Sequence, residues 1–336
     1  MVENMYAGSG VDFRKENDVV EAIKRILRCT FDYRVNMPYG QVQHDLGAYA
    51  NMVSLGDYSL ALTTDGVGSK VLIAQALGKY EAVGIDCVAM NVNDIICVGA
   101  EPIAMVDYIA MQNMDINIAK EIAWGLAKGA KEANVAIIGG ETASMPDVIR
   151  GVGDRGFDLA GTALGVVKKD KIITGSGIAV GDVVLGMSSS GVHSNGLTLA
   201  RNVLPKNMWV NLLVPTKIYV KDVLNIISNY SVSGLAHITG GGFLNLNRLT
   251  NYGFLLDSLP VVPPIFKKIQ EFGNVSDDEM YRTFNMGVGF CVVVKPADVS
   301  AIESSFNAFR IGKIVKESGV IIKSDSSELK LTRVIY

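Results

Sequence analysis

The sequence predicts two domains that each combine helices with strands, the α+β or α/β class. The chain has 336 residues, more than one hydrophobic core usually organises. Apolar residues make up 49% of it and charged residues 19%, which suits packed cores and argues against disorder. Helix-like and strand-like segments alternate in both halves, and the polar stretch 168–174 separates them. We therefore expect an N-terminal domain over residues 1–168 and a C-terminal domain over residues 174–336.

The N-terminal half contains three predicted helices. Apolar residues at helical spacing predict the first, over residues 17–29. The long apolar stretch 80–98 predicts a buried helix, and the Ala, Ile, Leu and Lys content of residues 118–133 indicates another. Short apolar runs predict strands at 59–64, 103–111, 135–138 and 158–167.

The C-terminal half opens with a predicted strand, residues 182–187, that ends in a run of serines and a glycine. Helices are expected near residues 197–204 and 219–228, followed by a glycine loop. Later strands are expected at 287–294 and 312–317.

Composition excludes several function classes. The formal net charge is −3 and no dense run of Lys or Arg occurs, which argues against nucleic-acid binding but allows a local pocket for a phosphorylated metabolite. The four cysteines form no CxxC pair, so buried reduced thiols are favoured over a catalytic thiol. The start of the chain lacks the apolar stretch of a signal peptide, and no apolar run reaches the ~20 residues of a membrane span. We expect a soluble cytoplasmic protein.

The first polar cluster, residues 65–70, follows a predicted strand directly. Its two glycines let the backbone approach a ligand, Asp65 is a candidate Mg²⁺ ligand, and Lys70 is a candidate phosphate contact. A hairpin turn explains the spacing equally well. The spacing differs from that of a Walker P-loop.

The second cluster lies inside the predicted buried helix 80–98. On a helix, Asn91 and Asp94 share one face, and Asp86 lies two turns before Asn93. Buried carboxylates at this spacing favour Mg²⁺ held through oxygen ligands. The alternative is that these polar side chains bond to neighbouring backbone groups.

The third cluster, residues 139–142, also follows a strand. Glu141 is a candidate metal ligand or general base, and the glycines before it leave N–H groups free for an anion. A plain Gly-Gly turn before a helix cap is the alternative, and it is favoured when the cluster is considered alone.

The fourth cluster, residues 188–196, combines hydroxyls and glycines before a predicted helix, which suits a phosphate cradle. His193 is a candidate acid, base or hydrogen-bond donor to phosphate, although a lone histidine is more often structural. His237 opens a second loop of the phosphate type, residues 237–242. The pattern predicts Mg²⁺–nucleotide chemistry in the first domain and an anionic small molecule in the second, and it names no substrate.

These clusters, in this order, resemble the aminoimidazole ribonucleotide synthetase family of purine biosynthesis. The resemblance covers nearly the whole chain. Its segments are 6–12, 64–70, 84–94, 99–102, 107–108, 139–146, 158–161, 190–196, 236–242 and 284–289.

The resemblance implies a homodimer of two-domain subunits, in which the N-terminal sheets pair as a β-barrel flanked by helices beside a mixed α/β C-terminal domain. It implies ATP and Mg²⁺ as cofactors, with a monovalent cation as a further candidate, and a small phosphoribosyl substrate. The implied reaction is the ATP-dependent cyclisation of formylglycinamidine ribonucleotide to 5-aminoimidazole ribonucleotide, releasing ADP and phosphate. ATP phosphorylates the formyl amide oxygen, the amidine nitrogen attacks the activated carbon, and phosphate leaves as the ring closes.

Carried onto this sequence, the resemblance makes Asp65, Asp94 and Glu141 catalytic residues and metal ligands, with His193 as a catalytic acid or base. The implied ATP-binding residues are Gly66, Val67, Gly68, Ser69, Lys70, Asn91 and Asn93. The implied substrate-binding residues are Ser190, Gly191, Ser194, Asn195, Thr239, Gly240, Gly241 and Gly242.

The chain departs from the family pattern at two places. Ser144 stands where the family usually has Glu, and a hydroxyl cannot replace that charge. Residues 43–50 replace a Gly-Gly-Phe-Gly-like loop, which puts ATP contacts from there in question; His44 either contributes to them or faces solvent.

Other ATP-using members of the same superfamily are the alternative: selenophosphate synthetase, thiamine-monophosphate kinase, a hydrogenase maturation dehydratase or the related amidotransferase synthetase. The chain has no early Cys or Gly-Lys pair for the first and is too short for the last. A non-catalytic nucleotide-binding regulator, the alternative from another class, would bind ATP without turnover.

Overall fold

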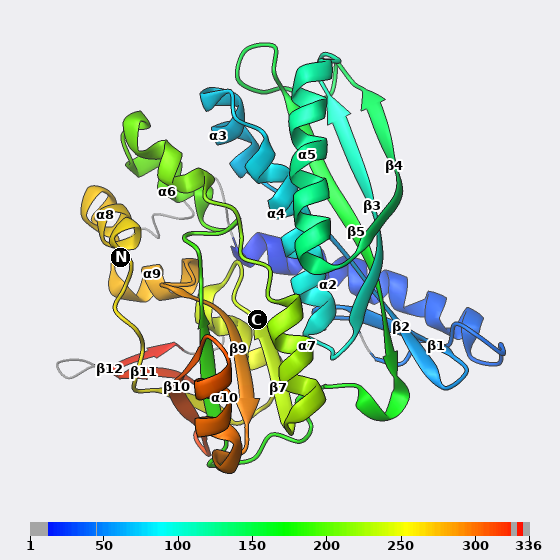
Figure 1. Ribbon diagram of the computed structural model, residues 1–336, viewed down its shortest axis with the longest axis vertical. Helices are drawn as coiled ribbons and strands as arrows, with labels where there is room; N and C mark the ends of the chain where they lie inside the picture. Colours follow the sequence, from blue (N-terminus) through cyan, green and yellow to red (C-terminus); the bar gives the residue numbers. More distant parts are fainter. Residues whose placement is uncertain (1–12, 45, 324–327, 332–336) are drawn as a thin grey trace.

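Two sheets, each with its own helices, make up the computed structural model, which describes residues 13–44, 46–323 and 328–331. The domains lie side by side, with α4 at their contact (Figure 1). Mixed helix and strand content in two domains confirms the predicted fold class at that level. The resembling segment 6–12 lies outside the described residues. No helix in the described part of the chain is both long and apolar enough to cross a bilayer.

The N-terminal sheet has five strands in the order β1-β2-β5-β3-β4 and is antiparallel except between β3 and β4. Its strands are β1 (Asn51–Leu55), β2 (Tyr58–Gly66), β3 (Glu101–Met111), β4 (Ala136–Ser144) and β5 (Phe157–Lys168). The helices of this domain are α2 (Phe13–Leu27), α3 (Lys70–Leu77), α4 (Glu81–Ile96) and α5 (Ile116–Ala133), and the 3₁₀ helices are η1 (Arg28–Arg34) and η2 (Lys169–Lys171).

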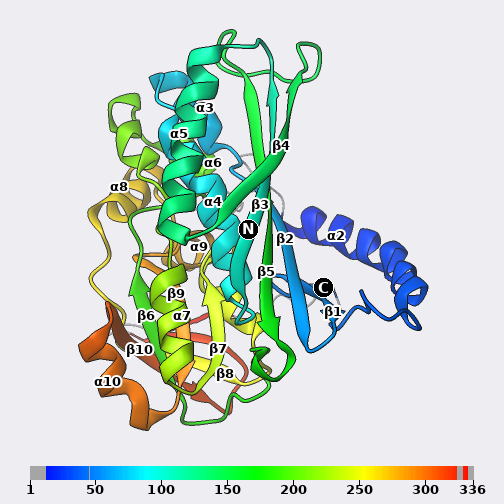
Figure 2. The same ribbon diagram turned by 45° about the vertical axis from the view of Figure 1, so that its right-hand side comes forward.

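One face of this sheet is covered by α4, with α5 packed outside it (Figure 2). The two helices meet at glycines: a Cβ on Gly125 would lie 2.0 Å from the Glu81 carbonyl oxygen, and one on Gly84 would lie 2.3 Å from that of Ile122. α4 in turn rests on Gly161 of β5, where a Cβ would lie 2.9 Å from the Asn91 side chain. Small residues therefore let a helix that is buried nearly all round lie close to the strands.

The opposite face of the sheet carries exposed apolar side chains. Leu62, Val106 and Tyr108 are 44%, 39% and 38% exposed, and their strand pairing places them on the side away from α4. Among the described residues, no helix lies on this side of β3 and β4, and α2 extends away from the body of the molecule (Figure 2). A sheet with one bare apolar face is incomplete as a core.

The C-terminal sheet has seven strands in the order β12-β11-β8-β10-β6-β9-β7, antiparallel except between β11 and β8. Its strands are β6 (Val183–Ser188), β7 (Val232–His237), β8 (Gly253–Leu256), β9 (Val288–Val294), β10 (Ala308–Val315), β11 (Gly319–Lys323) and β12 (Glu328–Leu331). Its helices are α6 (Leu197–Val203), α7 (Val220–Asn229), α8 (Pro264–Gly273), α9 (Asp277–Thr283) and α10 (Val299–Ser305), with 3₁₀ helices η3 (Lys206–Leu213), η4 (Gly242–Arg248) and η5 (Pro296–Asp298). β9, buried throughout, lies between β6 and β7.

All the predicted helices and strands appear, with shifted ends. The strand expected at 312–317 spans 308–315, and the first helix lies at 13–27. The strand expected to stop at Ile138 continues through the glycines to Ser144, because its backbone keeps pairing with β3 beyond a bulge. The polar stretch 168–174 lies between the last strand of the first sheet and the first strand of the second.

Candidate functional site

Three polar side chains from both domains meet at the domain interface. Asp65 ends β2, Asp94 lies on α4, and His237 ends β7. His237 Nδ1 lies 2.8 Å from Asp94 Oδ1, and with the proton on that nitrogen the ring donates to the carboxylate. The His237 side chain is fully buried, whereas 16% of the Asp94 side chain is exposed. His237 therefore holds Oδ1 of Asp94 in place, while the Asp94 side chain stays partly accessible to solvent.

Asp65 is the second carboxylate of this cluster. Burial, and after it the charge of Asp94, raise the pKa of Asp65 to about 6. Two carboxylates that repel each other in a desolvated place suit a divalent cation with oxygen ligands, and Mg²⁺ takes further ligands from phosphates and water. The residues therefore fit Mg²⁺, although no group of three His, Cys, Asp or Glu side chains able to hold a metal occurs among the described residues.

Glu141 does not join the two aspartates in this subunit. β4 continues through it, and its pairing with Tyr108 places it on the bare face of the sheet. Asp65 pairs with Gly161, whose missing side chain would point at α4, so Asp65 belongs to the opposite face. One chain therefore does not bring the predicted metal triad together, because alternation along the strand places Glu141 on the other side of the sheet.

Lys70 does not reach a ligand either. Its side chain is fully buried, and its Nζ lies 2.7 Å from Asp86 Oδ2, also fully buried, and donates to the Val214 carbonyl at 2.7 Å. Asp86 Oδ1 accepts a hydrogen bond from the Thr216 amide at 2.6 Å. Burial lowers the pKa of Lys70, and the Asp86 charge opposes that shift. The predicted phosphate contact is instead an ion pair that joins the domains.

Asn91 and Asn93, predicted to bind ATP, are fully buried and bond to backbone. Asn91 accepts from the Asp65 amide at 3.0 Å and donates to the Asp65 carbonyl at 3.2 Å. Asn93 accepts from the Tyr219 amide at 3.0 Å and donates to the Lys217 carbonyl at 2.9 Å. The amides of both residues thus satisfy main-chain groups, as the alternative expected, although the groups bound by Asn93 are distant in the sequence.

The segment after β2 is only partly open to a ligand. Val67 is fully buried, and Ser69 accepts a hydrogen bond from Thr198 of α6 at 3.0 Å. Gly68 has φ +67°, and nothing lies within 4 Å of the place where its Cβ would be. Gly68 is therefore the member of this cluster that leaves room for a ligand to approach the backbone, whereas a Cβ on Gly66 would lie 3.6 Å from the Leu159 carbonyl oxygen.

His193 lies in the loop between β6 and α6 with φ +60° and is 1% exposed. Its Nε2 accepts from the Ser190 amide at 3.2 Å, and its buried Nδ1 has no hydrogen-bond partner among the described residues. Burial, with the positive charges of His237, Lys70 and Lys217, lowers the pKa of His193 well below 6.5. The ring is therefore neutral at pH 7, with Nδ1–H as a donor rather than an imidazolium acid.

The two predicted substrate loops lie against each other. Asn195 Oδ1 lies 3.2 Å from the place of a Cβ on Gly240, and Asn195 Nδ2 is buried without a partner in the described structure. The second loop turns tightly, with the Gly242 amide donating to the Thr239 carbonyl at 3.0 Å and φ +93° at Gly241. The remaining residues of the first loop, Ser190 and Ser194, bond to residues 215 and 216. The structure thus places the two loops next to each other, and their role in substrate binding stays a prediction.

A row of rings joins His237 to His193 through the interior. His237 stacks on Phe290 at 6.3 Å between centroids, Phe290 lies 5.3 Å from Tyr219, and Tyr219 lies 6.4 Å from His193. Gly289 makes room, because a Cβ there would lie 2.1 Å from the Tyr219 hydroxyl. The carboxylate cluster and the substrate loops are therefore parts of one rigid region.

Sequence reasoning missed three features near this region. The pairing of His237 with Asp94, 143 residues away, leaves no local signal. Tyr49 donates to the Asn245 carbonyl at 3.3 Å, and the Arg248 guanidinium lies 4.9 Å from its ring centroid. Lys217 lies beside the substrate loops and was not singled out.

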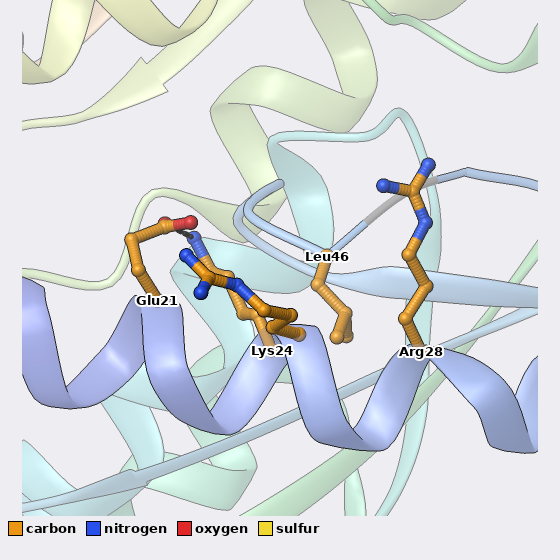
Figure 3. A pocket seen from close by; sticks show the side chains of 5 residues that line it. Glu21, Lys24, Arg28 and Leu46 are labelled. Carbon is orange, nitrogen blue, oxygen red and sulfur yellow. Dashed lines mark hydrogen bonds and ion pairs between the residues drawn. The ribbon is translucent and has the colours of Figure 1, made fainter.

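A basic cavity of about 240 Å³ lies apart from these residues, between α2 and the loop at Leu46 (Figure 3). It is lined by Glu21, Lys24, Arg25, Arg28 and Leu46. Lys24 pairs with Glu21 at 2.8 Å, so the two arginines give the lining a net positive charge. His44 lines a smaller neighbouring cavity with Arg28.

The chain has the two-domain architecture of the AIR synthase related proteins. The N-terminal domain model of that family matches residues 47–167, and the C-terminal one matches residues 179–325. A hydrogenase maturation protein HypE has a TM-score of 0.62 at 19% identity, over 82% of this chain and 89% of that one. Thiamine monophosphate kinase of Aquifex aeolicus has a TM-score of 0.64 at 16% identity, over 94% and 98%. Likeness at such identity shows the fold alone.

Relatives with about 50% sequence identity to this chain share one name. The phosphoribosylformylglycinamidine cyclo-ligase of Pyrococcus furiosus is 50% identical over 95% of this chain and 97% of its own length. That of Methanocaldococcus jannaschii is 48% identical over 91% and 89%. The chain belongs to the phosphoribosylformylglycinamidine cyclo-ligase family.

Proposed function

We propose that the protein converts formylglycinamidine ribonucleotide and ATP into 5-aminoimidazole ribonucleotide, ADP and phosphate, and works in the cytoplasm. The observation that best supports this proposal is the 50% identity, over 95% of the chain, with a phosphoribosylformylglycinamidine cyclo-ligase. The carboxylates and the two glycine loops at the domain interface supply the polar groups that such a reaction needs. The superfamily alternatives rest on identities of 19% or less.

An amide oxygen leaves poorly, and its phosphorylation turns it into a phosphate leaving group. Asp65 and Asp94 would hold Mg²⁺, which neutralises charge on the phosphates. His237 orients Asp94 by binding Oδ1, so that its other oxygen stays available to the site. Because the pKa of His193 is lowered, its ring is neutral at pH 7. It then acts as a hydrogen-bond donor through Nδ1–H and not as an imidazolium acid. Catalysis then rests on positioning and on charge stabilisation.

The first test follows ADP release and imidazole formation with purified protein, Mg²⁺ and formylglycinamidine ribonucleotide. Equal amounts of both products, formed only with that substrate, support the proposal. ATP consumption with another acceptor would move the assignment to a superfamily alternative, and ATP binding without turnover would indicate a regulator. Asp94→Asn keeps an oxygen for His237 and should lower turnover at least 100-fold. Asp57→Asn, in the exposed turn between β1 and β2, should not.

The bare face of the N-terminal sheet supports the second part of the proposal, a homodimer whose two sheets pair as a β-barrel. Its exposed apolar side chains gain a core from a second copy, and Glu141 on this face would then be directed toward the partner. Val106→Asp should shift sedimentation from dimer to monomer. Ile116→Asp changes an equally apolar but distant residue, 68% exposed at the start of α5, and should leave the dimer intact.

A further inference from the structure

The chain segment 214–219 connects η3 to α7 and is held by the first domain along its length. Asn93 of α4 accepts from the Tyr219 amide and donates to the Lys217 carbonyl, at 3.0 and 2.9 Å. The Lys70–Asp86 ion pair bonds to the main chain at residues 214 and 216. The backbone under Lys217 is thus fixed on both sides.

The Lys217 side chain is half-buried and has no counter-ion among the residues that the structure describes. No carboxylate in the described part of the chain lies within ion-pair distance of its ammonium. Its Nζ lies 5.2 Å from the centroid of the Tyr219 ring, a cation–π contact that offsets only part of the lost hydration. A half-buried ammonium without an anionic partner favours the binding of an anionic ligand beside it.

The substrate loops lie next to this cation. Ser190 donates to the Pro215 carbonyl at 2.5 Å, and the Ser194 hydroxyl lies 3.3 Å from that of Thr216. His193, with its unpartnered Nδ1, packs 6.4 Å from the same Tyr219 ring. Hydroxyls and an imidazole ring therefore contact the residues on both sides of Lys217 in the segment that carries the charge.

We propose that Lys217 binds a phosphoryl group of the reactants, supplying the positive charge that the two glycine loops lack. Residues 188–196 and 237–242 contain no Lys or Arg, and the ammonium of Lys70 is already paired with Asp86. The phosphoryl group comes from the phosphate ester of the substrate or from the nucleotide, and both offer the same dianionic oxygens. This inference rests on the proposed function.

The test compares Lys217→Met and Lys217→Arg with the native protein. Lys221→Met is the control, because Lys221 is exposed on the neighbouring α7. Lys217→Met should weaken the affinity for inorganic phosphate, measured by calorimetry, and raise KM for one reactant about 10- to 100-fold. An increase in the KM of formylglycinamidine ribonucleotide assigns the group to the ester, and one in that of ATP assigns it to the nucleotide. Lys217→Arg should retain most of the affinity.

The urea stability of Lys217→Met distinguishes a ligand-binding role of Lys217 from a structural one. Removing a half-buried cation without a partner should leave urea stability equal or higher, whereas loss of a structural contact would lower it together with the affinity. Unchanged phosphate affinity and unchanged KM values in Lys217→Met would overturn the proposal. Phosphate binding needs no turnover, so it reports on Lys217 even if no imidazole forms, in which case the proposed function alone fails.

Discussion

Asp86→Ala is expected to destabilise the protein by about 3–5 kcal/mol, the usual consequence of leaving one member of a buried ion pair alone. Both side chains are fully buried, and their charged atoms lie 2.7 Å apart. The substitution also leaves the Thr216 amide without its acceptor. Lys70 must then stay charged without a partner or lose its proton.

The pH dependence gives this prediction a sign. Burial already lowers the pKa of Lys70, and removing Asp86 takes away the charge that opposes the shift. The unfolded variant then binds more protons than the folded one between the lowered and the normal pKa, so its stability rises with pH. The deficit of Asp86→Ala against wild type should shrink from pH 7 to pH 9.

Urea unfolding at both pH values measures these quantities. Lys70→Met combined with Asp86→Leu should recover most of the lost stability, because no lone charge remains buried. The exposed pair of Lys128 and Glu81, at 2.6 Å, is the control, and Glu81→Ala should cost about 1 kcal/mol or less. A loss below about 1 kcal/mol in Asp86→Ala, or a double variant as unstable as the single one, would refute the reasoning.

Three further predictions follow from single residues. The pKa of about 6 at Asp65 exceeds its unfolded value of 3.8, so its contribution to stability is complete below pH 3.8 and is lost as pH rises through 6. Urea unfolding should therefore show wild type losing up to about 3 kcal/mol relative to Asp65→Asn between pH 4 and 7. Gly125→Ala puts a Cβ 2.0 Å from a carbonyl oxygen and should lower the unfolding free energy by about 2 kcal/mol or more, whereas Gly177→Ala, whose Cβ would lie 3.7 Å from the Ser233 Cβ, should change it by less than about 0.5 kcal/mol. Because burial lowers the pKa of His193 well below 6.5, His193→Asn should lower turnover without changing the shape of the pH–rate profile from pH 6 to 8.

Local patterns predicted the elements that dominate the N-terminal domain. The stretch 80–98 is mostly apolar, and it forms the buried helix α4. Strands β2, β3 and β5 were visible as short apolar runs bounded by polar residues. The end of β4 was wrong, because two glycines suggest a turn locally, whereas pairing with β3 keeps them extended.

The assignment of polar residues to a ligand was less successful for a physical reason. A sequence shows that Asn93 or Lys70 lies among apolar neighbours, and it does not show which distant atom satisfies it. Their main-chain partners are 124 to 144 residues away in the other domain. His237 was noted only as the start of a loop, although its contact with Asp94 makes it part of the site.

α4 explains why the domain interface and the site cannot be separated. It presents Asp94 to the site, while Asp86 and Asn93 hold the segment of the second domain that carries Lys217. A rotation of one domain against the other would break the hydrogen bonds of Asp86 and Asn93 to residues 216, 217 and 219 and leave these buried polar groups without partners. The relative position of the carboxylates and the substrate loops is therefore set by folding, and reactants meet groups that are already in place.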